Sequence, residues 1–261
     1  MTAENVGRLG LRPRPVVERN YVSFRHHWWV LLSGVFEPFF YLAGMGLGLG
    51  GLVGDIELQG QAISYTTFVA AGLLASTAMN GAIADATFNF FYKLKESRVF
   101  DAMMYTSLRM SDVLVGEVAW AIARGAFYSF VFLLVALLFG AVSSWWALLS
   151  LPAAILIALA FSTLGTFCTT FVRVWADFDL MQLVILPMFM CSTTFFPLSA
   201  YPGWAHPIVQ ATPLYNGVAL IRDLHTGLVG WHDVGHAVYL VTLGVLFGWL
   251  TVRRMHRLFF V

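Results

Sequence analysis

The chain has 261 residues, of which 59% are hydrophobic and 11% are charged, with a net charge of +1. Soluble domains carry about 25% charged residues, so this composition excludes a soluble globular domain and predicts that lipid covers much of the surface. The near-neutral balance gives no indication of a nucleic-acid partner. Cys168 and Cys191 both lie in apolar stretches, which argues against a disulfide framework.

Residues 1–28 are predicted to lie outside the membrane core, as a cytoplasmic tail followed by an interfacial helix. Their arginines are spread over a stretch that has no apolar core, which is unlike a cleavable signal peptide. Residues 11–28 place apolar side chains at helical spacing, which favours an amphipathic helix in the membrane interface. These side chains are Val17, Tyr21, Phe24 and Trp28. Residues 1–10 fit a disordered basic tail.

Six apolar stretches follow, each close to the 20 or so residues that cross a bilayer. They cover residues 29–50, 64–86, 113–139, 147–172, 180–198 and 233–252. We therefore predict an all-α, polytopic membrane protein with six transmembrane helices. Its spanning domain covers residues 29–252, and a cytoplasmic tail follows at 253–261.

Positive charge is distributed unevenly among the connecting segments. Thirteen of the 15 Lys and Arg residues fall in the two tails and in the segments 87–112 and 173–179, whereas the loops 51–63 and 140–146 have none. Because Lys and Arg are retained on the cytoplasmic side, both termini are predicted to face the cytoplasm of a bacterial inner membrane. Arg124 and Arg222 are the exceptions.

Glu37 in the first span and Arg124 in the third are the two deepest ionisable residues. A lone charge at the bilayer centre costs about 2.5–3.5 kcal/mol, so their similar depth and opposite sign predict a pair. Asp85 and Glu117 lie nearer the surface and could complete a network. The pair could fix helix register, form part of a gate or relay protons, and the first interpretation is favoured because no intramembrane His accompanies it.

Glycines in the first span predict a close helix contact. Gly44 and Gly48 have the spacing of small residues at helix interfaces. A nucleotide loop is excluded because no strand precedes the glycines. Pro38 is expected to kink the same helix.

Residues 87–112 form the longest charged segment between spans. It interleaves apolar residues such as Phe100 and Met104 with charges such as Glu96 and Asp101. Apolar residues exposed on a cytoplasmic helix usually mark a partner site, so docking of a soluble protein is favoured over a simple membrane-surface helix.

Polar side chains in the second and fifth spans have two interpretations. They could bond to neighbouring helices, or they could line a translocation path for an amphiphile together with Met and aromatic residues. The residues assigned to such a path are Thr77, Asn80, Met188, Thr193, Thr194 and Phe195.

The outer segment before the last span contains four prolines, yet it is too apolar for a solvated loop. Two short re-entrant helices at 199–232 satisfy both facts, because backbone at membrane depth must be helical or covered by protein. The second is predicted near 214–224. His232 and His236 have the i, i+4 spacing of metal ligands, but they lack a third ligand in sequence. Interfacial anchoring is favoured, and no metal site is assigned.

Four separated motifs resemble those of ABC type-2 exporter permeases. They are EPFFYLAGMGLGLG at 37–50, KESRVFDAMMYTSLRMSDVLVGE at 95–117, FFPLSAYP at 195–202 and PLYNGVALIRDLHTG at 213–227. They occur in the family's order and extend over almost the whole chain. Within that family, the chain is similar to the permeases that export nodulation lipo-oligosaccharides and daunorubicin-type drugs.

The resemblance implies a dimer of permease subunits, identical or similar, with two nucleotide-binding ATPase subunits. Spans 2 and 5 would then face the dimer axis. By match, the ATPase-coupling residues are Glu96, Arg98, Phe100, Asp101 and Met104. The outer gate would be formed by Phe196, Pro197, Pro213, Leu214, Tyr215 and Arg222.

The expected function is export of an amphiphilic, lipid-linked, glycan or drug-like substrate, driven by ATP on separate subunits. The chain has only two lysines, Lys93 and Lys95, and neither follows glycine. A GxxxxGK[ST] phosphate loop is therefore impossible. ATP and Mg would bind the partner subunit, and this chain is expected to bind no cofactor. A gradient-driven carrier or channel without an ATPase is the alternative. A membrane-embedded enzyme lacks a reactive cluster.

Overall fold

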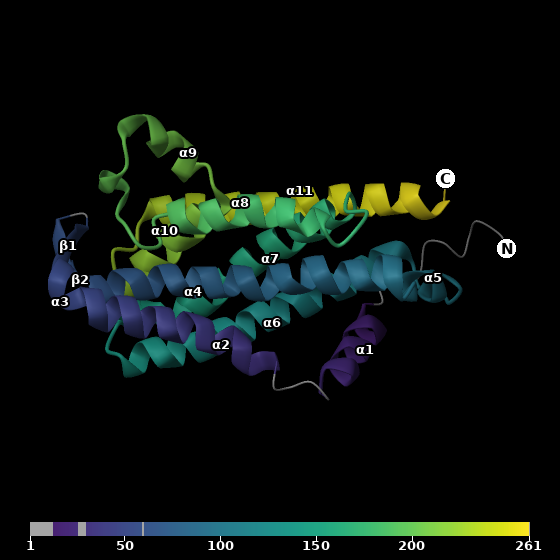
Figure 1. The fold of residues 1–261 in the computed structure, drawn as a ribbon, viewed down its shortest axis with the longest axis horizontal. Helices are drawn as coiled ribbons and strands as arrows, with labels where there is room; N and C mark the ends of the chain where they lie inside the picture. Colours follow the sequence, from purple (N-terminus) through teal and green to yellow (C-terminus); the bar gives the residue numbers. More distant parts are fainter. Residues whose placement is uncertain (1–12, 26–29, 59, 261) are drawn as a thin grey trace.

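Long helices that run roughly along one common axis form the body of the protein (Figure 1). The computed structural model describes residues 13–25, 30–58 and 60–260. A two-stranded hairpin lies at one end of the bundle, named the hairpin end, and α5 lies at the other, named the α5 end. The predicted basic tail at 1–10 and Trp28 fall outside the described residues.

The elements have the following bounds. The helices are α1 (Arg14–Phe24), α2 (Val30–Tyr41), α3 (Gly50–Val53), α4 (Tyr65–Ala84), α5 (Val99–Met104), α6 (Met110–Leu138), α7 (Ser150–Thr169), α8 (Asp177–Cys191), α9 (His206–Gln210), α10 (Pro213–Thr226) and α11 (Trp231–Phe260). The π-helical segments are η3 (Leu42–Leu49), η4 (Asp85–Asn89) and η5 (Tyr92–Glu96). The 3-10 turns are η6 (Trp145–Leu149), η7 (Leu198–Ala200) and η8 (Gly203–Ala205). The strands are β1 (Asp55–Leu58) and β2 (Gln61–Ser64).

The polytopic helical architecture predicted from the sequence is confirmed, but the count of six spans is not. Among the described residues, five helical segments are long and apolar enough to cross a membrane. They are Phe36–Val53, Tyr65–Glu96, Met110–Leu138, Trp145–Thr169 and Trp231–Phe259. The predicted span at 180–198 corresponds to α8, which has 15 residues and is therefore about 22 Å long.

Two helices extend beyond the spans predicted from hydropathy, and one connecting loop contains regular structure. The helix of the second predicted span continues past residue 86, because η4 and η5 extend it to Glu96. The last helix continues past residue 252 to Phe260. The loop predicted at 51–63 contains most of the β-hairpin, in which β1 pairs antiparallel with β2 and Asp55 lies opposite Ser64. Hydropathy locates where a helix leaves lipid, and not where its hydrogen bonding stops.

The helix α4 lies at the centre of the bundle. In the apolar 18-residue window of its span, 83% of the residues are buried inside the protein, and the helix packs against α6, α7 and α10. Two glycines allow neighbours to approach it closely. A Cβ on Gly72 would lie 2.8 Å from the carbonyl oxygen of Thr194, which follows α8, and one on Gly81 would lie 2.6 Å from the Tyr128 ring of α6. Small residues allow such close approach between helices in a membrane.

The glycines chosen from the sequence as a packing site are not in one. A Cβ on Gly44 or Gly48 would meet no other atom within 4 Å. The close contact lies instead between α4 and α6, where a Cβ on Gly125 would lie 2.9 Å from the Ala78 carbonyl oxygen.

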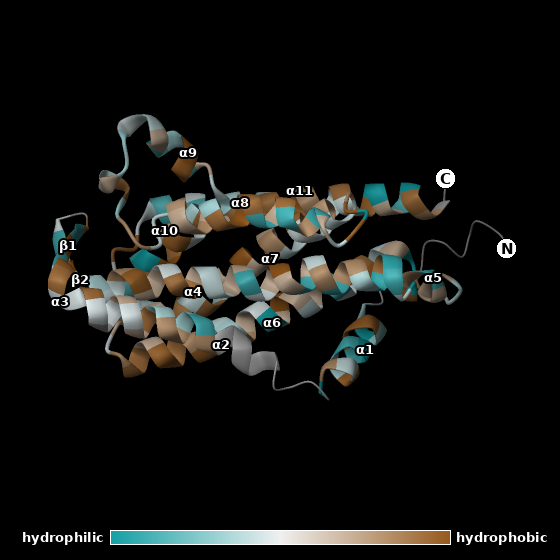
Figure 2. Cartoon of the chain, in the orientation of Figure 1, coloured by the Kyte–Doolittle hydropathy of each residue, from teal (hydrophilic) through white to brown (hydrophobic). Residues whose placement is uncertain are grey.

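The outer surface of the bundle has the composition of a lipid-facing one. Large apolar side chains such as Leu134, Leu138, Leu183 and Val245 are exposed. Hydrophilic residues gather on α1 and near α5, at the α5 end (Figure 2). On α1, Val16 is buried against Gly116 of α6, whereas Tyr21 of the predicted apolar face is exposed.

We expect Gly125→Val to destabilise the bundle, because its side chain would force α4 and α6 apart. Overpacking of this kind costs about 1–3 kcal/mol. The matched control is Gly44→Val, which adds the same side chain to open space. The melting temperatures of both purified variants are measured by heating them in detergent and detecting unfolding by size-exclusion chromatography. Equal melting temperatures for the two variants would contradict this account of the packing.

Candidate functional site

The α5 end presents a short helix mounted on the end of a long one. The helix that begins as α4 ends at Glu96. Arg98 then adopts a left-handed conformation, with φ of 47°, which turns the chain into α5. Such a φ is unfavourable for a residue with a side chain, so the surrounding packing has to hold the turn.

Phe100 provides that packing, and its predicted role in direct ATPase contact is wrong. The side chain is fully buried and packs with Phe90, Leu94 and Met255. An apolar residue in an amphipathic segment can face either a partner or its own core, and the sequence pattern does not distinguish them. Phe100 therefore anchors α5 to the bundle.

The other predicted coupling residues lie on the accessible side of this mount. Glu96 and Arg98 are exposed, and Asp101 and Met104 are half-buried. Tyr105, which sequence reasoning did not select, directly follows α5 and is 93% exposed. An aromatic residue at the tip of a charged loop is the signal that could have identified it. We name Glu96, Arg98, Asp101, Met104 and Tyr105 the α5 platform.

A buried carboxylate ties this end of the protein together. Glu117 of α6 accepts from Lys93 Nζ at 2.5 Å and from Arg19 Nη2 at 3.0 Å. It also accepts from Asn20 Nδ2 at 3.2 Å. These residues, named the Glu117 cluster, join α1, the extension of α4 and α6. The sequence had grouped Glu117 with Glu37 and Arg124, which it does not contact.

Aromatic rings connect the same extension to the turn before α8. Phe88 and Phe91 pack against Trp175 and Phe178, with ring centroids 4.7 to 6.5 Å apart. Trp175 Nε1 donates to Glu96 Oε1 at 3.3 Å. Edge-to-face and offset packing of this kind is favourable beyond its burial alone. The platform is therefore linked to α8 as well as to α6.

The predicted pair of Glu37 and Arg124 is not formed. Arg124 Nη1 lies 2.7 Å from Asp85 Oδ1, and Nη2 donates to the Tyr128 hydroxyl at 2.9 Å. Asn89 donates to the same carboxylate oxygen of Asp85. Glu37 is exposed, and none of the ion pairs found among the described residues includes it.

Glu37 and Arg124 nevertheless line the same cavity. It measures about 500 Å³, and its lining combines polar and apolar side chains. Two of the predicted path residues, Thr77 and Asn80, line it together with Gln182 and Phe189. The remaining path residues are elsewhere: Thr193, Thr194 and Phe195 are buried and Met188 is half-buried, and none of them lines this cavity.

At the other end of α4, Arg222 of α10 holds the chain that follows α8. Its Nη2 donates to the Thr193 carbonyl oxygen at 2.5 Å, and its guanidinium lies 3.7 Å from the centroid of the Phe68 ring. Thr193 has a φ of 57°, so a charged donor stabilises a strained turn. Burial lowers the pKa of Arg222 to about 10, which leaves it charged at neutral pH.

The structure therefore joins a predicted gate residue to a predicted path residue. The other gate residues lie nearby in sequence but on separate elements. Phe196 is exposed and Pro197 half-buried in the irregular chain after α8, whereas Pro213 and Tyr215 are half-buried in the first turn of α10. Leu214 is buried. The predicted helix at 214–224 is confirmed as α10.

Comparison with known proteins decides which family these features represent. The family model described as ABC-2 type transporter matches residues 15–224. Nodulation protein J of Rhizobium leguminosarum bv. viciae is 34% identical over 221 residues, which are 84% of this chain and 83% of that protein. This chain belongs to the ABC-2 type transporter family. It is a multi-pass membrane permease, as the motifs predicted.

Two further relatives support the assignment of this permease. Nodulation protein J of Rhizobium meliloti (strain 1021) is 30% identical over 215 residues, which are 81% of this chain and 80% of that protein. The inner membrane transport permease YadH of Escherichia coli (strain K12) is 25% identical over 224 residues, which are 84% of the permease and 82% of YadH. The similarity thus extends over most of each chain.

We expect Asp85→Asn to destabilise the permease more than Glu37→Gln. Removing one partner leaves the other charge buried, which costs about 3–5 kcal/mol, whereas Glu37 is exposed and forms no ion pair. Thermal unfolding in detergent measures the difference, with both substitutions changing a carboxylate to its amide. A larger loss of thermal stability for Glu37→Gln than for Asp85→Asn would contradict this expectation and favour the pair of Glu37 and Arg124 predicted from the sequence.

Proposed function

We propose that the permease is the membrane subunit of an ATP-driven exporter with both termini in the cytoplasm. Two permease copies, identical or similar, work with two nucleotide-binding subunits that bind ATP and Mg. The substrate is amphiphilic, lipid-linked, glycan-bearing or drug-like, and it moves outward from the cytoplasm or the inner leaflet. Membership of the ABC-2 type transporter family supports the ATPase partner, and the name of YadH, a transport permease, supports transport.

The observation that carries this proposal is the α5 platform. Exposed charges, Glu96 and Arg98, and an exposed aromatic ring, Tyr105, flank the short helix α5, which buried Phe100 fixes to the bundle. Protein interfaces are enriched in aromatic residues, Met and Arg, which the platform supplies as Tyr105, Met104 and Arg98. A mobile loop would dissipate an applied force, whereas a mounted helix transmits it.

The contacts of the platform give the force a route. The Glu117 cluster passes movement to α1 and α6, and the ring contacts of Trp175 pass it to the start of α8. The helix of α4 runs without a break from Tyr65 to Glu96. The same helix therefore carries the mount at one end and Phe68, beneath Arg222, at the other.

Closure of the ATPases would press on the platform and displace this helix. Displacement of α4 changes the contact between Phe68 and Arg222, and with it the hold of Arg222 on Thr193. The turn after α8 would then be free to open. A contact converts a small shift into opening only when it has two discrete arrangements. The contact of the Arg222 guanidinium with the strained turn at Thr193 would be either made or broken, which gives it two such arrangements.

The cavity between the two ends supports an amphiphilic substrate. Thr77, Asn80 and Gln182 supply hydrogen-bonding groups, and Ile185, Leu186 and Phe189 supply apolar surface. Binding pockets typically combine a mostly apolar lining with a few polar groups that fix orientation. An unaccompanied small ion would leave the apolar part of this lining without a role.

Copurification is the first test of the ATPase partner. We expect the tagged permease, extracted from its native host in mild detergent, to bring down a nucleotide-binding subunit in about equal amount, identified by mass spectrometry. The same experiment reveals whether the second permease copy is identical. Recovery of the folded permease without an ATPase would contradict the proposal and favour a gradient-driven carrier.

Charge reversal at the platform tests the docking surface itself. We expect Glu96→Lys and Arg98→Glu to lower the recovery of the nucleotide-binding subunit, because both exposed charges would contact it. Recovery relative to the permease is measured by quantitative mass spectrometry after size-exclusion chromatography. Asp55→Lys, an equal reversal at the exposed hairpin, is the matched control. If all three variants recover the wild-type amount, α5 is not the docking surface.

A further inference from the structure

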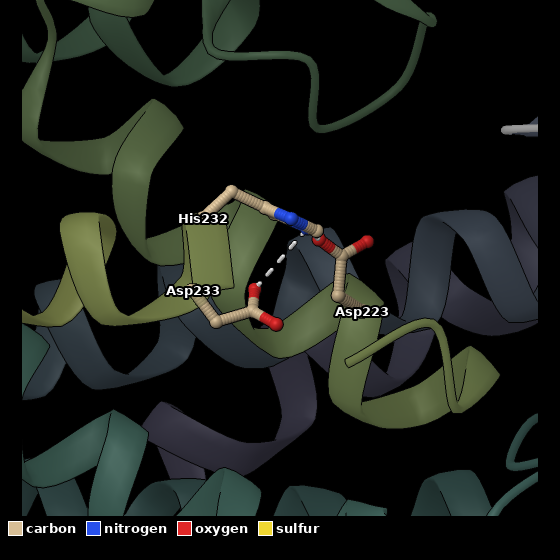
Figure 3. A group of neighbouring side chains, drawn as sticks. All are labelled: Asp223, His232 and Asp233. Atoms are coloured by element: carbon tan, nitrogen blue, oxygen red, sulfur yellow. Dashed lines mark hydrogen bonds and ion pairs between the residues drawn. The ribbon is translucent and has the colours of Figure 1, made fainter. Parts of the chain in front are cut away.

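Three metal-ligating side chains meet where α10 approaches the start of α11. Asp223 comes from α10, and His232 and Asp233 come from the first turn of α11 (Figure 3). His232 Nε2 lies 2.8 Å from Asp223 Oδ2 and 3.7 Å from Asp233 Oδ1. One ligand atom from each residue lies within 4.8 Å of the other two.

This spacing is close to what one small cation requires. Zinc holds nitrogen and oxygen ligands at about 2.0–2.2 Å in tetrahedral geometry, so neighbouring ligand atoms lie about 3.4 Å apart. The two distances to His232 lie on either side of that value. The separations among all three ligand atoms stay within 4.8 Å, so binding of a single ion requires the side chains to rotate until each pair lies near that value.

An unsatisfied buried oxygen points independently to a cation. Asp233 is only 6% exposed. Its Oδ2 accepts from the Gly230 backbone N–H at 2.8 Å, but its Oδ1, which faces His232, has no hydrogen-bond partner. Buried polar atoms are rarely left without a partner. A cation at this position would supply the missing interaction.

The two carboxylates also carry charge that needs compensation. Asp223 is 5% and Asp233 6% exposed, and both face the same imidazole of His232. Two facing carboxylates in a buried setting disfavour each other's ionised form. The side chain of His232 is 46% exposed, so an ion has a route from water into the cluster.

We infer that Asp223, His232 and Asp233 form a binding site for a divalent transition-metal ion of the zinc class. Imidazole nitrogen with two carboxylate oxygens suits zinc, whereas magnesium and calcium prefer oxygen ligands alone. Three protein ligands leave the fourth position for water. The ion joins α10 to α11, one residue from Arg222, and so fixes the helix that holds the turn after α8.

The ligand set differs from the pair of histidines that the sequence brought to attention. His236 Nδ1 lies 2.8 Å from Asn216 Oδ1, and His236 is not among the three residues whose ligand atoms come together. The third ligand that the sequence lacked is Asp223, which comes from a separate helix. This inference does not depend on the transport proposed above, because metal binding is measured on the permease alone.

The test is a zinc titration of the full-length permease, purified in detergent and freed of metal by a chelator. We expect wild type to bind one zinc ion per chain by isothermal calorimetry and to melt at a higher temperature with zinc, because an ion that binds only the folded state stabilises it. His232→Ala and Asp233→Asn should bind zinc at least about tenfold more weakly and lose the thermal shift.

His206→Ala is the matched control, because His206 lies on α9 and its ring contacts the Tyr201 carbonyl oxygen outside the cluster. It should bind zinc as wild type does. Asp233→Asn keeps the shape of the side chain, so it remains informative if His232→Ala fails to fold. Absence of zinc binding by wild type, or equal binding by Asp233→Asn and wild type, would overturn the inference. So would magnesium binding as tight as zinc binding.

Discussion

The close packing of α4 is the constraint on which the rest of the structure depends. This helix is surrounded by α6, α7 and α10, and its glycines admit neighbouring backbone at distances that any Cβ would prevent. Helix association in a membrane relies on such contact, because an apolar helix surface gains no hydrophobic free energy when it leaves lipid. A helix enclosed in this way moves as a unit, and the polar contacts near both of its ends move with it.

The buried charges follow from the same arrangement. Arg124 and Asp85 lie on neighbouring helices in close contact, so the two pair with each other, and Tyr128 and Asn89 add one hydrogen bond to each. Depth along a helix, which the sequence gives, determines which charges share a level of the membrane. The face on which each charge lies depends on helix rotation, which is a property of the packed bundle. Prediction from the sequence therefore assigned Arg124 the wrong partner, since Arg124 pairs with Asp85 and not with Glu37.

Features set by local sequence were predictable, and features set by tertiary contact were not. Hydropathy located the polytopic architecture, and the prolines together with the apolar segment Leu214–Leu224 located α10. The burial of Phe100 escaped prediction because an apolar residue beside charges fits a docking surface equally well. The hairpin at 55–64 escaped prediction because its two strands have 4 residues each. Strands this short do not show enough alternation of polar and apolar residues to be distinguished from a loop. Asp223 and His232 meet only because α10 folds back against α11.

The brevity of α8 has a consequence for the lipid around it. The helix is about 8 Å shorter than a typical hydrocarbon core of about 30 Å, and its exposed face is apolar, with Leu180, Leu183 and Val184 turned outward. Acyl chains beside a short hydrophobic surface compress to match it, at a modest cost for each ångström of mismatch. A bilayer in contact with this face would therefore be thinned, unless a second protein covers the face. A lipid-anchored molecule that crosses beside α8 would then have a shorter apolar distance to travel than across a hydrocarbon core of typical thickness.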